Sequence, residues 1–128
     1  MSQGMDAVRR ICQSWPELTL DDWREICTAD VTYQNMPWDR LVHHGPDAIH
    51  ETLSSFSDQF GVRMEIKQLA GSDDVVFSER TEHFASTDSG PDGAAREPFS
   101  LPVTGVFELR DGKVSAWRDY FDRRAMKS

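Results

Sequence analysis

The clearest structural signal in this chain is an Asp-Gly pair, Asp111-Gly112, between two stretches of alternating sequence, Phe99–Leu109 and Lys113–Phe121. Asp and Gly tolerate the positive backbone φ angles of a two-residue hairpin turn, so this pattern is the strongest hairpin signal that a short segment can carry. We therefore expect two antiparallel strands here, and a sheet against which the rest of the chain must pack.

The register of this hairpin decides which side chains face the interior. Counting back from the turn without a bulge pairs Trp117 with Val106 and Asp119 with Thr104. Since Trp117 and Val106 are apolar, the face that they share is expected to point inward. Asp119 lies two residues from Trp117, and side chains two apart on a strand share a face. The pattern therefore predicts a carboxylate that points into the protein.

The first half of the chain has helical periodicity. Apolar residues three or four apart mark three helices: Met5, Val8, Cys12 and Trp15 in the first, Leu20, Trp23 and Cys27 in the second, and Ile49, Leu53, Phe56 and Phe60 in the third. Pro16 is expected to end the first helix, and Thr19 to cap the second. Gly45-Pro46 is expected to open the third helix, and Gly61 to end it.

The other strands are expected at Val31–Asn35, between the second and third helices, and at Val62–Leu69 and Val75–Phe84. Ala85–Pro98 is rich in Gly, Pro, Ser and Asp and is expected to be a long loop or hairpin tip. These elements predict an α+β fold, in which a curved, mainly antiparallel sheet wraps around three helices and encloses a cone-shaped pocket. The length of 128 residues fits one domain, residues 1–128.

Charge, hydropathy and cysteine content indicate the partners and the environment expected for this protein. The net charge is -8, which disfavours nucleic acid and anionic membranes as partners, because both need a basic surface. No apolar run approaches the roughly 18 residues of a membrane span. Cys12 and Cys27 are expected to be buried, reduced thiols of a cytoplasmic protein.

Three pairs of residues two apart on expected strands carry groups suited to chemistry: Tyr33 and Asn35, Arg80 and Glu82, and Trp117 and Asp119. Each pair alone is weak evidence, since an Arg-x-Glu on a strand is usually a surface ion pair. An inward Asp119 needs a partner, however, and one arginine can hold two carboxylates apart and oriented. One acid can then keep its proton while the other acts as a base.

The order and sequence of these segments resemble a known family. The runs Gly105-Val106-Phe107-Glu108-Leu109 and Trp117-Arg118-Asp119-Tyr120-Phe121-Asp122, on either side of the turn, closely resemble limonene-1,2-epoxide hydrolases of the SnoaL-like, nuclear transport factor 2-like superfamily. Tyr33-x-Asn35 and Glu79-Arg80-x-Glu82 look like the family's other two active-site segments. The resemblance implies a cofactor-independent hydrolase of a small epoxide, with no metal, that forms a homodimer.

Carried over position by position, the resemblance implies acid and base chemistry in one step. Asp119 would take a proton from a water molecule that Tyr33 and Asn35 hold. Glu82 would protonate the epoxide oxygen as the ring opens, and Arg80 would bridge the two acids. The product would be a vicinal diol, formed without a covalent intermediate.

The pocket is expected to have a mostly apolar wall, shaped by Trp117. Further contacts with an apolar epoxide are expected from the third helix, the segment after Asn35 and the strand before the turn: Leu53, Phe56, Met36, Leu101 and Val103. This mixture suits an apolar or terpenoid-like epoxide.

One position departs from the family pattern and leaves alternatives open. Glu82 stands where the family usually has Asp, so its carboxyl has a similar intrinsic pKa but reaches one methylene further. An isomerase or an epoxide-opening cyclase of the same fold is one alternative, and a non-catalytic small-molecule binding protein is another. The adjacent His43 and His44 lack the neighbours that a metal site needs, and no metal is expected.

Overall fold

The computed structural model describes residues 3–38, 41–86 and 98–126. The helical elements are α1 (Gln3–Ser14), η1 (Trp15–Glu17), α2 (Leu20–Ile26), α3 (Gly45–Gln59) and η2 (Arg123–Met126). The strands are β1 (Cys27–Asn35), β2 (Val42–His44), β3 (Phe60–Gly71), β4 (Val75–Ser86), β5 (Phe99–Arg110) and β6 (Lys113–Tyr120). Most of the expected loop at Ala85–Pro98 lies outside the described residues, and its first two residues belong to β4.

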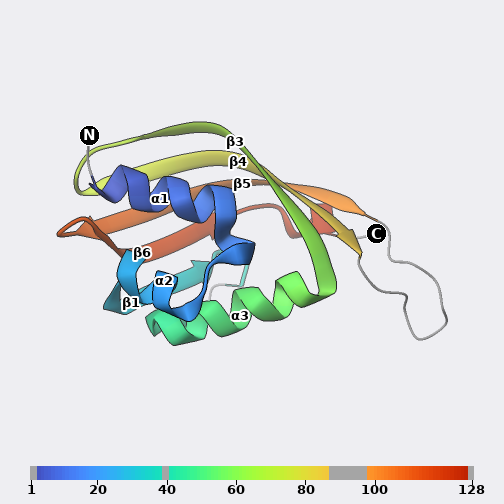
Figure 1. Cartoon of the computed structure of the whole chain (residues 1–128). Helices are drawn as coiled ribbons and strands as arrows, with labels where there is room; N and C mark the ends of the chain where they lie inside the picture. Colours follow the sequence, from blue (N-terminus) through green and yellow to red (C-terminus); the bar gives the residue numbers. More distant parts are fainter. Residues whose placement is uncertain (1–2, 39–40, 87–97, 127–128) are drawn as a thin grey trace.

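The strands form one sheet in the order β2-β1-β6-β5-β4-β3. Strand β1 runs parallel to β6, whereas the other neighbouring strands are antiparallel. The sheet is strongly curved, and α1, α2 and α3 lie on its concave side (Figure 1). The expected α+β fold, a curved and mainly antiparallel sheet around three helices, is confirmed.

The starts of α2 and α3 follow the local sequence, whereas α3 ends at Gln59, so that Phe60, expected on this helix, and Gly61, expected to end it, belong to β3. Thr19 caps α2 in a capping box: its side chain accepts a hydrogen bond from the backbone of Asp22, and the Asp22 side chain accepts one from the backbone of Thr19. Pro46 occupies the first turn of α3, where no backbone N–H is needed. The expectation that Cys27 lies on the second helix is wrong, because the backbone there is already extended and Cys27 opens β1.

The hairpin turn forms as expected, with positive φ angles of 54° at Asp111 and 80° at Gly112. Its predicted register is wrong by one residue, because an irregularity follows Glu108. Trp117 therefore pairs with Phe107 instead of Val106.

The same shift pairs Asp119 with Gly105 instead of Thr104. Phe107 and Gly105 are buried, whereas Thr104 is exposed and Val106 is only partly buried. The inward face of β5 is therefore the opposite of the one predicted. The inward direction of Trp117 and Asp119 is nevertheless correct, because it depends on alternation within β6 alone.

The core lies between the helices and the concave face of the sheet. Trp117 is at its centre, stacked on Tyr33, Phe107 and Trp23, with ring centroids 4.2, 5.3 and 6.1 Å away. Cys12 and Cys27 are buried and unpaired, as expected. Burial raises the pKa of the Cys12 thiol to about 11 and that of Cys27 to about 12, so both stay protonated at neutral pH.

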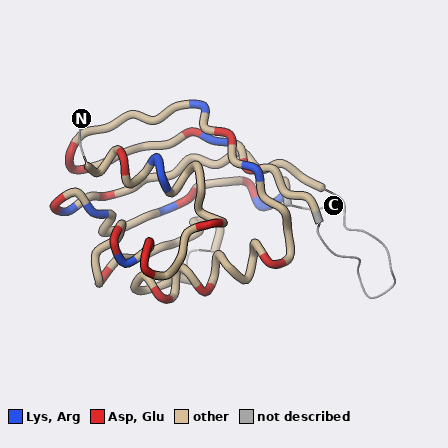
Figure 2. The backbone as a smooth tube through the Cα atoms, viewed as in Figure 1, with Lys and Arg blue, Asp and Glu red and all other residues tan. Residues whose placement is uncertain are grey.

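The net charge is -8, and acidic residues recur along α2 and α3 (Figure 2). Among the residues that the structure describes, no helix is both long and apolar enough to cross a membrane.

The turn offers a test of the hairpin. Replacing Gly112 with Ala forces a side chain into a positive-φ position, and the added carbon would lie 2.6 Å from Gln3 Oε1. We expect the free energy of unfolding to fall by about 1–2 kcal/mol in urea titrations. Gly61→Ala, at an exposed position of β3, is the matched control and is expected to change stability little. Equal stability of the two variants would contradict this role of the turn.

Candidate active site

Adjacent strands bring the two acids and the arginine together. Arg80 and Glu82 lie on the inward face of β4, and Asp119 lies on the inward face of β6. Strand β5 separates them, with Gly105 paired to Asp119 on one side and to Ser78 of β4 on the other. Because Gly105 has no side chain, the long arginine can reach across β5 to the aspartate.

The guanidinium of Arg80 is the hub of this cluster. Its Nε donates to Glu82 Oε2 at 2.8 Å, its Nη2 to Asp119 Oδ2 at 2.7 Å, and its Nη1 to Ser78 Oγ at 2.9 Å. Arg80, Asp119 and Glu82 are only 1%, 4% and 7% exposed. The usual alternative for an Arg-x-Glu pair, a solvated surface ion pair, is therefore excluded.

Burial and charge give the members of this cluster different proton affinities. Burial raises the pKa of the Glu82 carboxyl above its ordinary value; the nearby charge of Arg80 opposes this shift, and the negative charge of Asp119 adds to it. Burial also opposes the charge of Arg80, but Asp119 and Glu82 outweigh it and raise the pKa of the guanidinium. The Glu82 carboxyl therefore binds its proton more tightly than an exposed glutamic acid does, beside an arginine that stays charged.

Tyr33 and Asn35 lie beside Asp119 because β1 runs parallel to β6. In that register Tyr33 pairs with Trp117, and Asn35 pairs with Asp119. The Tyr33 hydroxyl donates to Asn35 Oδ1 at 3.1 Å, and Trp117 Nε1 donates to Asp119 Oδ1 at 2.7 Å. Burial raises the pKa of Tyr33 well above its ordinary value, so the phenol keeps its proton and remains a hydrogen-bond donor.

A cavity opens directly onto these groups. Its lining combines the polar residues Tyr33, Asn35, Glu82 and Asp119 with the apolar residues Trp15, Leu53, Phe56, Phe84, Leu101, Val103 and Phe121. It leaves about 60 Å³ for the centres of water-sized molecules, several times the roughly 10–15 Å³ that one water needs. An apolar wall with a few convergent polar groups is typical of a small-molecule site.

Four of the expected pocket residues, Leu53, Phe56, Leu101 and Val103, line this cavity, whereas Met36 and Trp117 do not. Met36 lines a separate hollow with Pro37 and Tyr120, and its backbone N–H donates to the backbone oxygen of Asp119 at 2.8 Å. Trp117 is covered by the rings stacked on it, so it orients Asp119 instead of forming the wall.

Sequence reasoning missed five residues of this region: Trp15, Phe84, Phe121, Ser78 and Gly105. The first three line the cavity, and the Trp15 side chain also donates a hydrogen bond to Glu82. Ser78 and Phe84 could have been found, because they continue the two-residue spacing of Arg80 and Glu82 along one strand face. Trp15 could not, because its position depends on how α1 packs on the sheet.

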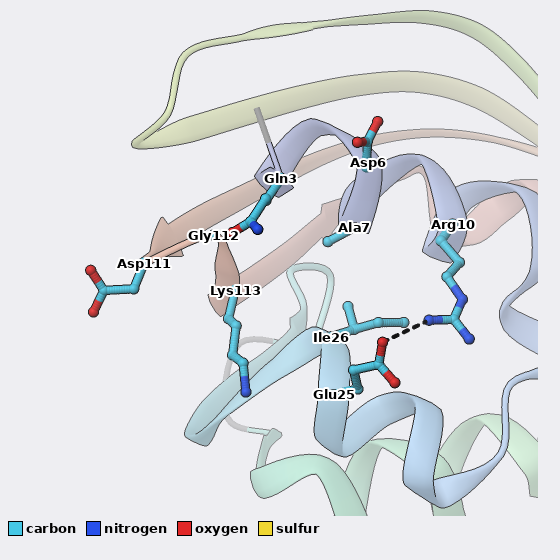
Figure 3. A pocket seen from close by; sticks show the side chains of 9 residues that line it. All are labelled: Gln3, Asp6, Ala7, Arg10, Glu25, Ile26, Asp111, Gly112 and Lys113. Atoms are coloured by element: carbon cyan, nitrogen blue, oxygen red, sulfur yellow. Dashed lines mark ion pairs between the residues drawn. The ribbon is translucent and has the colours of Figure 1, made fainter. Parts of the chain in front are cut away.

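A second hollow lies between the start of α1, the end of α2 and the β5–β6 turn (Figure 3). Its wall carries charges of both signs, with Arg10 3.9 Å from Glu25 across it. None of the acid and base candidates lines it.

Within residues 3–38, 41–86 and 98–126, no three His, Cys, Asp or Glu residues gather closely enough to hold a metal ion.

The buried charges predict a pH-dependent cost of removing the arginine. Arg80→Met leaves Asp119 and Glu82 without their counterion, so at pH 7 we expect the free energy of unfolding to fall by about 3–5 kcal/mol. Without Arg80 the folded-state pKa of Glu82 rises further, because the charge that lowers it is gone, so the loss shrinks as the pH falls and Glu82 is protonated. Urea titrations from pH 5 to pH 8 measure this dependence.

Arg118→Met is the matched control, because Arg118 makes an ion pair with Glu108 at partly exposed positions. Its loss is expected to cost at most about 1 kcal/mol at any of these pH values. Equal, pH-independent losses for the two variants would contradict the role of Arg80 as a buried counterion.

The chain is similar in sequence to a known epoxide hydrolase. Epoxide hydrolase EphG of Mycobacterium tuberculosis (strain H37Rv) is 30% identical over 93 residues, which are 73% of this chain and 56% of that protein. The match thus spans little more than half the length of this relative.

Two solved structures show the same fold. An LEH-like epoxide hydrolase of M. tuberculosis superimposes with a TM-score of 0.76 at 22% identity, covering 97% of this chain and 86% of that one. A protein assigned as a SnoaL-like polyketide cyclase from Jannaschia sp. CCS1 has a TM-score of 0.80 at 18% identity, covering 97% and 88%. The sequence model of the limonene-1,2-epoxide hydrolase catalytic domain matches residues 3–128. The chain therefore belongs to the limonene-1,2-epoxide hydrolase catalytic domain family.

Proposed function

We propose that this protein hydrolyses a small, mostly apolar epoxide to a vicinal diol by one-step general acid and base catalysis. The observation that carries the proposal is the buried Arg80 held between Asp119 and Glu82, with both acids on the wall of an apolar cavity. An arginine bridge keeps two acids close while their proton affinities differ, which suits simultaneous proton removal and proton donation.

In this mechanism Asp119 is the general base. A water molecule bound by Asp119, Tyr33 and Asn35 loses a proton to Asp119 as its oxygen attacks a ring carbon. The carbon–oxygen bond of the epoxide breaks, and Glu82 protonates the departing oxygen. Asp119 is then protonated and Glu82 ionised, so one proton must pass from Asp119 to Glu82 before the next turnover.

The apolar wall supports an apolar substrate, and the limited room supports a small one. Leu53, Phe56, Leu101 and Val103 offer hydrocarbon contacts opposite the acids. The SnoaL-like polyketide cyclase is under 25% identical and shares the fold only, so it adds no support to the cyclase alternative. Assembly as a homodimer and a cytoplasmic location stay predictions of the sequence.

The first test is diol formation from a panel of terpene, cycloalkene and styrene oxides. We expect turnover by the unaltered protein and a fall in kcat of at least about a hundredfold in Asp119→Asn, since the base is lost. Asp122→Asn removes a carboxylate from a 55% exposed side chain of the same segment and is expected to keep full activity. No turnover of any epoxide by the folded protein would refute the hydrolase proposal.

The pH profile tests the general acid. Glu82 acts only when protonated, and burial raises its pKa, so kcat should fall as the pH rises through a pKa that lies above the ordinary value of a glutamic acid. Glu82→Gln should lower kcat by about a hundredfold or more and abolish this alkaline limb. Glu79→Gln alters an exposed acid on the outer face of β4 and should leave the profile unchanged. An unaltered alkaline limb in Glu82→Gln would exclude Glu82 as the acid.

A further inference from the structure

Three residues form a row across the central strands, and the last of them is Asp119 of the acid–base cluster. Ser78 of β4 pairs with Gly105 of β5, and Gly105 pairs with Asp119 of β6. All three are buried on the concave face of the sheet. Ser78 and Gly105 do not line the cavity, so a direct contact with substrate does not account for them.

Gly105 leaves a space that functional atoms occupy. A Cβ at this position would lie 2.8 Å from Arg80 Nη1, 2.8 Å from Asp119 Oδ1 and 2.9 Å from Ser78 Oγ. Real Cβ atoms essentially never approach other heavy atoms this closely. Glycine weakens the interior of a strand, and its presence there often marks a close approach by another group. Here the group that approaches is the guanidinium of Arg80, together with its partners.

Ser78 gives the third nitrogen of that guanidinium a hydrogen-bond partner. Two of the three nitrogens donate to the acids, and Ser78 Oγ accepts from the third at 2.9 Å. With a partner on each nitrogen, the plane of the guanidinium can neither rotate nor slide without breaking a hydrogen bond. Ser78 also contacts the Cys12 thiol of α1, whose neutral form adds no charge to the cluster.

We propose that Gly105 and Ser78 are positioning residues, which set the distance and orientation between acid and base by fixing the guanidinium of Arg80. The proposal rests on the proposed function where it concerns the rate, but the orientation itself is a property of the folded protein. Gly105 leaves the space that the guanidinium occupies, and Ser78 accepts the hydrogen bond of its third nitrogen.

Gly105→Ala tests the room. The added carbon displaces Arg80 from the carboxylates, and a misplacement of about 1 Å can cost about a hundredfold in rate. We expect kcat to fall by about that factor with KM nearly unchanged. The pKa of Glu82 should rise, because the charge that lowers it moves away. A ¹³C NMR titration of the glutamate carboxyls, with Glu82→Gln used for assignment, measures this shift without any substrate.

Ser78→Ala tests the anchor and adds no bulk, so it covers the case in which Gly105→Ala does not fold. It leaves Arg80 Nη1 without its acceptor, and we expect a fall in kcat of about tenfold and a displaced alkaline limb of the pH profile. Thr104→Ala adjoins Gly105 on the exposed face, and Ser115→Ala removes a hydroxyl that donates only to the backbone oxygen of Glu108 in β5. Both control variants should have the kcat and the pH profile of the unaltered protein.

The outcomes separate this inference from the hydrolase proposal. Epoxide turnover by the unaltered protein, with unchanged kcat, pH profile and Glu82 titration in both folded variants, would overturn the positioning role and leave hydrolysis standing. If the unaltered protein turns over no epoxide, the NMR titration decides alone. A raised Glu82 pKa in Gly105→Ala then supports positioning, and an unchanged pKa refutes it.

Discussion

The rest of the site depends on a buried guanidinium that must be neutralised where water cannot reach it. Arg80 is 1% exposed, and a charge at such a position is tolerated only with close counterions and filled hydrogen bonds. Asp119, Glu82 and Ser78 meet that demand, one at each nitrogen. The same contacts hold two acids at the wall of one cavity, so the electrostatic requirement of the fold and the geometry of the proposed chemistry coincide.

The curved sheet makes this arrangement possible. The inward faces of β4, β5 and β6 converge on the concave side, and the glycine in the middle strand lets side chains of the outer two meet. The parallel pairing of β1 with β6 then sets Tyr33 and Asn35 beside the aspartate. Trp117, stacked between Tyr33 and Phe107, anchors this end of the site and donates a hydrogen bond to Asp119.

Much of this could be predicted because it depends on local chemistry. The helical stripes, the Thr19 cap and the Asp111-Gly112 turn follow from backbone preferences over a few residues. The inward direction of Asp119 follows from alternation along its own strand. This prediction was therefore correct although the predicted register of the hairpin was wrong. The register failed because a single irregularity after Glu108, which no local signal marks, reverses the face of the whole partner strand.

The order of elements, the turn and the identity of the paired polar residues follow from the amino-acid sequence, because each is encoded within a short segment of the chain. Which of these residues meet depends on how the helices and strands pack together. Trp15 reaches the cavity through the packing of α1, and Gly105 matters because of atoms on two other strands. Met36 and Trp117, which were expected to line the cavity, do not line it, and this too depends on tertiary packing. Contacts between residues far apart in the chain depend on register and curvature, which are properties of the assembled sheet.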